Sequence, residues 1–232
     1  MAELNIFSVG AAQALVNALT PRLLAETGVE VHATFQPVGA LREKLAGGAQ
    51  CDLVVSSHVM LEELALEGRI VADTVAMLGR VRTGVAVRAR DRAPAIATRD
   101  ELRTTLAAAP AIYIPDPVRA TAGSHFLKVV QSLGLAHELS SRLRPHPTGA
   151  AAMAALARSE QEGSIGCTQI TEIRMTPGVK LVGPLVGAFE LATAYAVGLS
   201  ASARPGGHAR RFAEMLAGRE SAALRLQSGF EP

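Results

Sequence analysis

Strand-like runs alternate with helix-like runs along this chain, and the alternation constrains the fold more than any other feature. Residues 4–9 are apolar and β-like, and residues 11–26 repeat apolar side chains at helical spacing. The cycle returns at residues 30–35 and 39–46, and again at 52–55 and 59–66. Three successive β-α units predict a parallel sheet with right-handed crossovers.

A second series of the same kind follows. It predicts strands at 84–87, 111–114, 164–167, 179–182 and 192–199, with helices opening at 99 and spanning 122–133, 149–158, 206–216 and 220–226. The composition is 49% hydrophobic but only 3% aromatic, so Ala, Leu and Val supply most of the core. Such a core favours helices packed closely on a sheet, and 232 residues suffice for two lobes of about 100 residues each.

The charge is balanced, with 23 basic and 21 acidic residues. No basic stripe and no set of stacking aromatic residues is present, so a nucleic-acid partner is not expected. No apolar run reaches 18 residues, which predicts no membrane span. The first residues lead directly into a strand, so as written we expect a cytoplasmic protein, or a periplasmic one if a signal peptide was removed.

Two cysteines, Cys51 and Cys167, are too few for a disulfide framework. Each borders a short apolar run, so we interpret them as small core residues, and a disulfide between them stays open without a distance. The histidines show no metal-binding spacing, and no phosphate-binding or dinucleotide motif is present. Neither a metal nor a cofactor is expected.

Several short segments carry a family resemblance through their order and spacing. They are residues 6–12, 34–41 and 47–56, the pair Asp116-Pro117 with Gly123, and residues 162–166 and 181–185. Together they resemble the molybdate-binding branch of the type II periplasmic, or extracellular, solute-binding proteins. The resemblance implies an α/β fold of two lobes, each a mixed, mainly parallel sheet flanked by helices. Residues 1–83 and 196–232 would form lobe 1 and residues 84–195 lobe 2, with the ligand in a cleft between them.

The resemblance, and the rule that open α/β sheets bind ligands at the carboxyl ends of their strands, predict where ligand contacts lie. Helix N-termini at these places offer free N–H groups to an anion. The predicted ligand-binding residues are Gly10, Ala11, Ala12, Val38, Gly39, Ala40, Ser56, Ser57, Arg119, Thr121, Ala122, Thr148, Cys167, Thr168 and Gln169. Simpler interpretations stay open: the small residues make tight turns, and Arg119 is a solvated loop residue. One of Ser56 and Ser57 caps the helix that follows, and Thr121 and Thr148 cap theirs.

The resemblance also implies a change of ligand. In the molybdate binders two serine hydroxyls and one tyrosine hydroxyl help to hold the oxyanion, and the matching positions here are Ala11, Gly39 and Cys167. Each lost hydrogen bond to a charged group costs about 1.5–3 kcal/mol, so molybdate and tungstate are not the expected ligands.

We therefore expect a binding protein for a small anion or small carboxylate, with an ABC transporter or a regulator protein as its partner. The alternative is a cytosolic isomerase or lyase of a small organic acid on the same fold. His58, His125 or Cys167 would then supply the acid or base.

Overall fold

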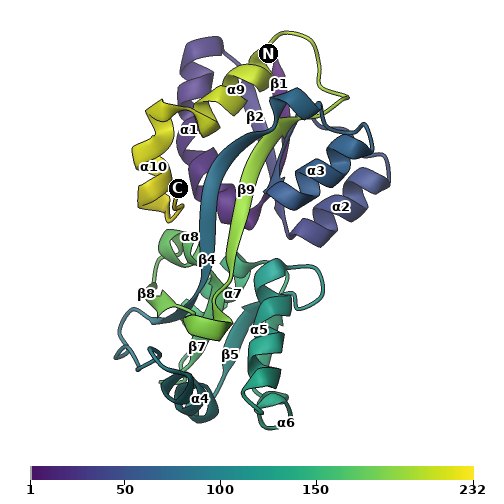
Figure 1. The fold of residues 1–232 in the computed structure, drawn as a ribbon. Helices are drawn as coiled ribbons and strands as arrows, with labels where there is room; N and C mark the ends of the chain where they lie inside the picture. Colours follow the sequence, from purple (N-terminus) through teal and green to yellow (C-terminus); the bar gives the residue numbers. More distant parts are fainter. Residues whose placement is uncertain (1) are drawn as a thin grey trace. The chain divides into compact units, whose positions relative to one another are not determined.

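A computed structural model describes residues 2–232 (Figure 1). The strands are β1 Glu3–Val9, β2 Glu30–Gln36, β3 Leu53–Ser57, β4 Ala76–Arg88, β5 Ile112–Pro115, β6 Leu143–His146, β7 Ile165–Gln169, β8 Val179–Pro184 and β9 Ala192–Leu199. The α-helices are α1 Gln13–Thr27, α2 Val38–Ala46, α3 His58–Leu66, α4 Arg99–Ala108, α5 Thr121–Ser132, α6 Ala136–Leu139, α7 Gly149–Arg158, α8 Ile170–Met175, α9 His208–Ala217 and α10 Ala222–Ser228. The short 3₁₀ helices are η1 Gly10–Ala12, η2 Ala72–Thr74, η3 Gly187–Phe189 and η4 Arg219–Ser221.

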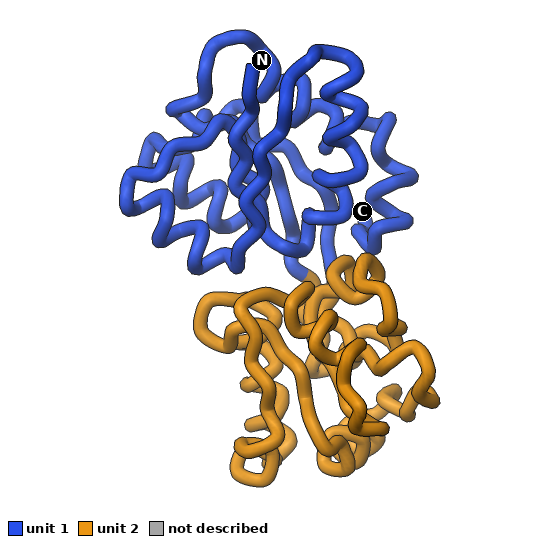
Figure 2. Tube along the Cα trace, turned by 180° about the vertical axis from the view of Figure 1, so that it is seen from behind, with its two compact units in different colours: residues 1–81, 193–232 blue, residues 82–192 orange. Residues whose placement is uncertain are grey.

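The chain forms two compact units. Unit 1 comprises Met1–Val81 and Thr193–Pro232, and unit 2 comprises Arg82–Ala192 (Figure 2). Both boundaries fall inside strands, so the chain passes from one unit to the other within β4 and returns within β9.

Unit 1 is a sheet with helices on both faces. Its strands have the order β2-β1-β3-β9; β1 runs parallel to β2 and β3, whereas β9 runs antiparallel to β3. Helix α1 contacts α9 and α10, while α2 and α3 lie across the sheet from them (Figure 1). The parallel pairing brings the carboxyl ends of β1, β2 and β3 to one edge.

Unit 2 repeats this layering. Strand β5 lies between β6 and β7 and runs parallel to both, β7 is antiparallel to β4, and β4 also pairs with β8. One core face holds side chains of α4, α5 and α6, such as Leu106, Phe126 and Leu139. The other core face holds side chains of α7 and α8, such as Met153 and Ile173.

The predicted mixed α/β class is confirmed, and most predicted elements are present within a few residues. Two short α-helices and one strand were not predicted, namely α6, α8 and β6. Strand β4 begins at Ala76, eight residues before the predicted start at Gly84. Both cysteines are free and buried, which decides the open question about them in favour of small core residues. Among the described residues, the helices are too short or too polar to cross a membrane.

A buried ion pair lies at the end of β4, and its arginine also binds the end of α7. Arg88, at the end of β4, donates from Nε and Nη2 to the two carboxylate oxygens of Asp91 at 2.7 and 2.6 Å. Its Nη1 donates to the carbonyl of Ser159, the C-cap residue that follows α7. The side chains of Arg88 and Asp91 are only 4% and 6% exposed, so solvent screens this pair weakly.

The ion pair predicts a specific pH dependence of stability. The hydrogen bonds from Arg88 lower the pKa of the Asp91 carboxyl below its ordinary value. The pair therefore stabilises the fold fully above the unfolded-state pKa of about 4, and this stabilisation is lost as the pH falls through the lower folded-state pKa. Asp91→Asn should lower the unfolding free energy at pH 7, and its deficit against wild type should shrink towards pH 2.

Urea titrations across this pH range measure the deficit. The control is Asp100→Asn, which changes an exposed carboxylate in the first turn of α4. If Asp91→Asn and Asp100→Asn give the same small, pH-independent change, the pair does not stabilise unit 2.

Helix α5 approaches the end of β5 very closely at Gly123. A Cβ placed at this residue would lie 2.5 Å from the carbonyl oxygen of Pro115 and closer still to that of Asp116. Only a residue without Cβ lets the helix start this near the strand. Gly123 thus fixes where the first turn of α5 stands relative to the loop that precedes it.

Gly123→Ala should lower the free energy of unfolding by about 1–3 kcal/mol, because the added methyl group must displace backbone. Chemical denaturation measures the loss. The matched control is Gly183→Ala, where the new Cβ would make an ordinary 3.6 Å contact with Ile96. Equal effects of the two substitutions would contradict this account of the packing.

Candidate functional site

The edge of unit 1 where its parallel strands end brings together three predicted turns. Strand β1 lies between β2 and β3, and α1 and α2 cover opposite faces, so the strand order reverses beside β1. At such a switch point the loops diverge and leave a crevice. The turns at this edge are Gly10–Ala12 after β1, 38–40 after β2 and 56–57 at the end of β3.

The first two turns carry small side chains and unprotected helix starts. No side-chain hydrogen bond caps η1, α1 or α2 within the described chain. Val38, Gly39 and Ala40 form the first turn of α2, and Gly10, Ala11 and Ala12 form η1. The N–H groups of a helix start that has no side-chain cap need another acceptor, and small side chains let one approach.

The serines at the end of β3 have different environments. The Ser57 hydroxyl accepts a hydrogen bond from the Met60 N–H at 3.4 Å, which confirms that Ser57 caps α3. Ser56 is fully buried and its Oγ lies 3.1 Å from the sulfur of Met60. Contact of either serine with a ligand stays a prediction.

Gln36 is a polar residue at this edge that was not predicted. It is the last residue of β2, and its buried side-chain oxygen has no hydrogen-bond partner within residues 2–232. A buried polar atom without a partner is costly, so it indicates a place where an outside group binds. The signal in the sequence was a polar residue directly before the turn Pro37-Val38-Gly39.

Unit 2 has the corresponding edge at the ends of β5, β6 and β7. The order β6-β5-β7 again places the first strand between the other two. The predicted residues Arg119, Thr121 and Ala122 follow β5, Thr148 follows β6, and Cys167, Thr168 and Gln169 end β7.

The loop after β5 is held by its own aspartate. The Asp116 Oδ1 accepts hydrogen bonds from the N–H groups of Val118 at 2.8 Å and Arg119 at 3.0 Å. These bonds lower the pKa of the Asp116 carboxyl. The Arg119 side chain is exposed. Thr121 is the first residue of α5 and does not cap it, because Ala120 holds the cap position; the capping interpretation of Thr121 is wrong.

The other predicted residues of unit 2 point largely inward. Thr148 caps α7 by accepting from the Ala151 N–H at 3.1 Å, as its capping interpretation predicted. Cys167 belongs to the apolar core, and burial raises the pKa of its thiol strongly. Thr168 is fully buried and donates to Glu172, an acidic residue that was not predicted. Gln169 is also buried.

The two candidate histidines lie in helices of different units. His58 opens α3, and its Nδ1 lies 3.4 Å from Glu62. His125 lies in α5, with its Nε2 2.8 Å from the carbonyl oxygen of Phe189. No group of three or more His, Cys, Asp or Glu side chains able to hold a metal ion is present among residues 2–232.

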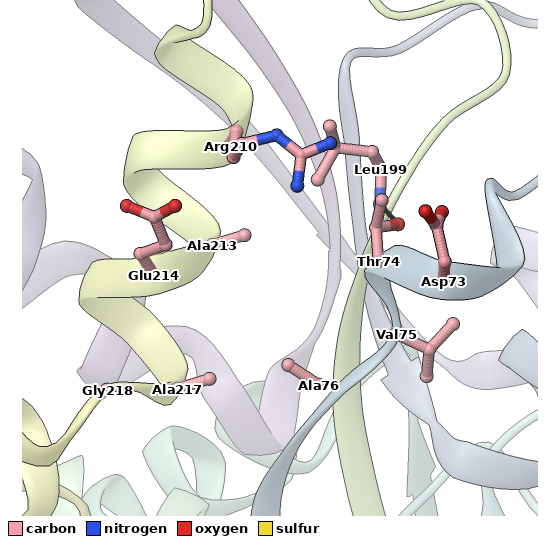
Figure 3. A pocket seen from close by; sticks show the side chains of 10 residues that line it. All are labelled: Asp73, Thr74, Val75, Ala76, Leu199, Arg210, Ala213, Glu214, Ala217 and Gly218. Atoms are coloured by element: carbon pink, nitrogen blue, oxygen red, sulfur yellow. Dashed lines mark hydrogen bonds between the residues drawn. The ribbon is translucent and has the colours of Figure 1, made fainter.

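A cavity of about 360 Å³ lies elsewhere in unit 1, between α9 and the segment that enters β4. Arg210 extends from α9 towards Thr74, while Asp73 and Glu214 add carboxylates at its border (Figure 3). None of the predicted ligand-binding residues lines this cavity.

Comparison with known proteins agrees with this fold. The periplasmic molybdate-binding protein of Azotobacter vinelandii superposes with a TM-score of 0.79 at 17% identity, covering 99% of each chain. The sulfate-binding protein of Mycobacterium tuberculosis superposes at 0.75 and 16% identity, covering all of this chain and 87% of the other. These matches confirm the predicted two-lobed fold. An aconitate isomerase of a Pseudomonas species is 25% identical over 235 residues, covering 99% of this chain and 87% of the relative.

A family model decides the membership. The model described as "Bacterial extracellular solute-binding protein" matches residues 4–231, which is nearly the whole chain. This protein therefore belongs to the bacterial extracellular solute-binding protein family.

Proposed function

We propose that this protein reversibly binds a small organic anion that carries carboxylate groups. The observation that carries the proposal is the pair of helix starts, η1–α1 and α2, that meet at the switch point of unit 1 without side-chain caps. Free N–H groups and the positive end of the helix dipole suit an anionic group. Membership of the family indicates that the protein binds a solute, and the two helix starts favour a solute with negative charge.

An organic anion fits the available groups better than a bare inorganic oxyanion. Ala11, Gly39 and Cys167 hold the positions where the molybdate binders use hydroxyl groups. The buried oxygen of Gln36 accepts hydrogen bonds, so it needs a donor such as an alcohol or a protonated acid. A hydroxy acid or polycarboxylate offers both kinds of group.

The predicted residues of unit 2 supply complementary groups. Arg119 offers a guanidinium for a carboxylate, and Gln169 can both donate and accept. The prediction that the ligand contacts both lobes in a cleft remains part of this proposal. We propose an ABC transporter as the partner, since the family is one of extracellular solute-binding proteins. A regulator protein is the alternative.

The aconitate isomerase relative favours a second candidate function, the isomerisation of an unsaturated carboxylate. A base would remove a proton from the methylene carbon, the double bond would shift, and an acid would return a proton to the former alkene carbon. His58 and His125 are the candidates for these roles. Cys167 is a poor one, because its buried thiol resists ionisation.

Isothermal calorimetry tests the binding function. Citrate, malate and trans-aconitate should bind at micromolar concentrations, at least tenfold more tightly than molybdate, sulfate or phosphate. A folded protein that binds none of the three carboxylates, or that prefers molybdate, would overturn the proposal.

The role of Arg119 can be measured on the same compounds. Arg119→Ala should weaken carboxylate binding about 10- to 100-fold, since a hydrogen bond to a charged group is worth about 1.5–3 kcal/mol. The control is Arg144→Ala, an exposed arginine of β6 whose Nη1 contacts the carbonyls of Ser141 and Leu143. Equal carboxylate affinities of the two variants would show that Arg119 does not bind the ligand.

The isomerase function is tested by proton NMR of trans-aconitate in D₂O with the wild-type protein. Turnover should produce cis-aconitate and introduce deuterium. His58→Ala or His125→Ala should slow it about 10²- to 10⁴-fold if that histidine transfers the proton. Binding without any isomer or deuterium exchange would exclude this second function.

A further inference from the structure

The two units repeat one connection. Unit 1 contains β1-α1-β2-α2-β3-α3, and unit 2 contains β5-α5-β6-α7-β7-α8 with α6 added after α5. In each unit the first of the three strands lies between the other two. The corner from β3 to α3 in unit 1 therefore corresponds to the corner from β7 to α8 in unit 2.

In unit 2 a carboxylate fills this corner. Glu172, the third residue of α8, is 5% exposed, and its Oε2 accepts a hydrogen bond of 2.5 Å from the Thr168 hydroxyl. The carboxylate lies directly on Gly149, the first residue of α7, and leaves no room there for a Cβ.

The surroundings of this carboxylate are mostly donors. Burial raises the pKa of the Glu172 carboxyl, while hydrogen bonds from Thr168 and from the N–H groups of Ala150, Gln169 and Gly149 oppose the rise. Two of these N–H groups belong to the first turn of α7. The hydroxyl of Thr148 accepts from the third residue of that turn, Ala151. The start of α7 is therefore supplied with acceptors from within unit 2.

In unit 1 the matching position is occupied by a neutral side chain. Met60 is the third residue of α3, as Glu172 is of α8. Ser56 matches Thr168, and its Oγ lies 3.1 Å from the Met60 sulfur, four residues away as in unit 2. A thioether carries no charge and is a weak acceptor. Helix α2, the counterpart of α7, has no side-chain cap.

We propose that Met60 and Glu172 decide which of two equivalent helix starts receives the anionic group of the ligand. Glu172 acts as an internal anion that occupies the start of α7, so an outside anion is excluded there because the N–H donors of this helix start already bind Glu172. Met60, its counterpart in unit 1, offers no such carboxylate, and the start of α2 has no side-chain cap. This assignment rests on the proposed binding of a carboxylate and makes Met60 and Glu172 residues that determine specificity.

The first experiment tests the internal anion and does not depend on the ligand. Glu172→Ala should lower the melting temperature, and sodium formate should restore about 2–4 °C of it relative to equal sodium chloride. Wild type should show no such difference, because its own carboxylate occupies the position. Equal responses of the two proteins to formate would overturn the assignment of Glu172.

A control separates the carboxylate site from general damage to α8. Thr171→Val changes the residue beside Glu172, a buried threonine whose hydroxyl has no partner among the described residues. Its melting temperature should fall less than that of Thr168→Val, which removes the donor to Glu172. If Glu172→Ala does not fold, this pair of threonine variants decides the matter, and equal losses count against the proposal.

The second experiment places a charge in unit 1. Met60→Glu should weaken binding of citrate, malate or trans-aconitate about 100-fold or more at pH 8, because the new carboxylate competes for the start of α2. Met60→Gln, of the same shape without charge, should lose much less. The difference between the two variants should shrink towards pH 5 as the new acid takes up a proton.

These outcomes separate the two levels of the proposal. Equal affinities of Met60→Glu and Met60→Gln at pH 8, with wild type binding normally, would overturn the specificity role. Absence of carboxylate binding by wild type would overturn the proposed function, and the formate experiment would still decide whether Glu172 is an internal anion.

Discussion

Parallel pairing of β1 with β2 and β3, and of β5 with β6 and β7, is the constraint on which the rest of the structure depends. Parallel strands need a crossover between them, and each crossover here contains a helix. Every strand of a set therefore ends at the same edge, and the following helix starts there. The chain thereby gathers backbone N–H groups at one edge of each unit before any specific side chain is chosen.

The side chains then distinguish the two edges. At unit 1 the turns are Gly10-Ala11-Ala12 and Val38-Gly39-Ala40, which supply few polar side-chain atoms. At unit 2 the N–H groups at the start of α7 already have acceptors within the same unit, namely the side chains of Thr148 and Glu172. Two copies of one connection thus differ at one helical position, which holds an acid in unit 2 and a thioether in unit 1.

Much of this could be predicted from the sequence, and the exceptions have physical causes. The long elements follow from periodicity and from stops such as Gly28, which adopts a left-handed conformation at the end of α1. Helix α6 escaped prediction because it has only four residues, about one helical turn. Strand β6 escaped because its sequence, Leu143–His146, is not an apolar run and contains a proline. Helix α8 escaped because its six residues are too few to show a helical repeat of apolar side chains.

Prediction of the site was more limited. The turns could be located, since they follow directly from strand ends. Glu172 could not, because its importance comes from contact with Gly149, which is distant in sequence and near only after α7 and α8 pack together. The apolar run beside Cys167 indicated its place in the core, but nothing in the sequence indicated that its neighbour Thr168 faces an acid.

The two passages of the chain within β4 and β9 have a consequence for biosynthesis. Unit 2 is one continuous segment, whereas unit 1 is interrupted by it and needs β9, which pairs with β3, from the end of the chain. On the ribosome the segment 82–192 is complete while unit 1 still lacks a strand and two helices. The order of synthesis therefore favours folding of the inserted unit first. Until β9 is made, the sheet of unit 1 is incomplete and the edge of β3 is unpaired. At this stage the nascent chain is most exposed to aggregation.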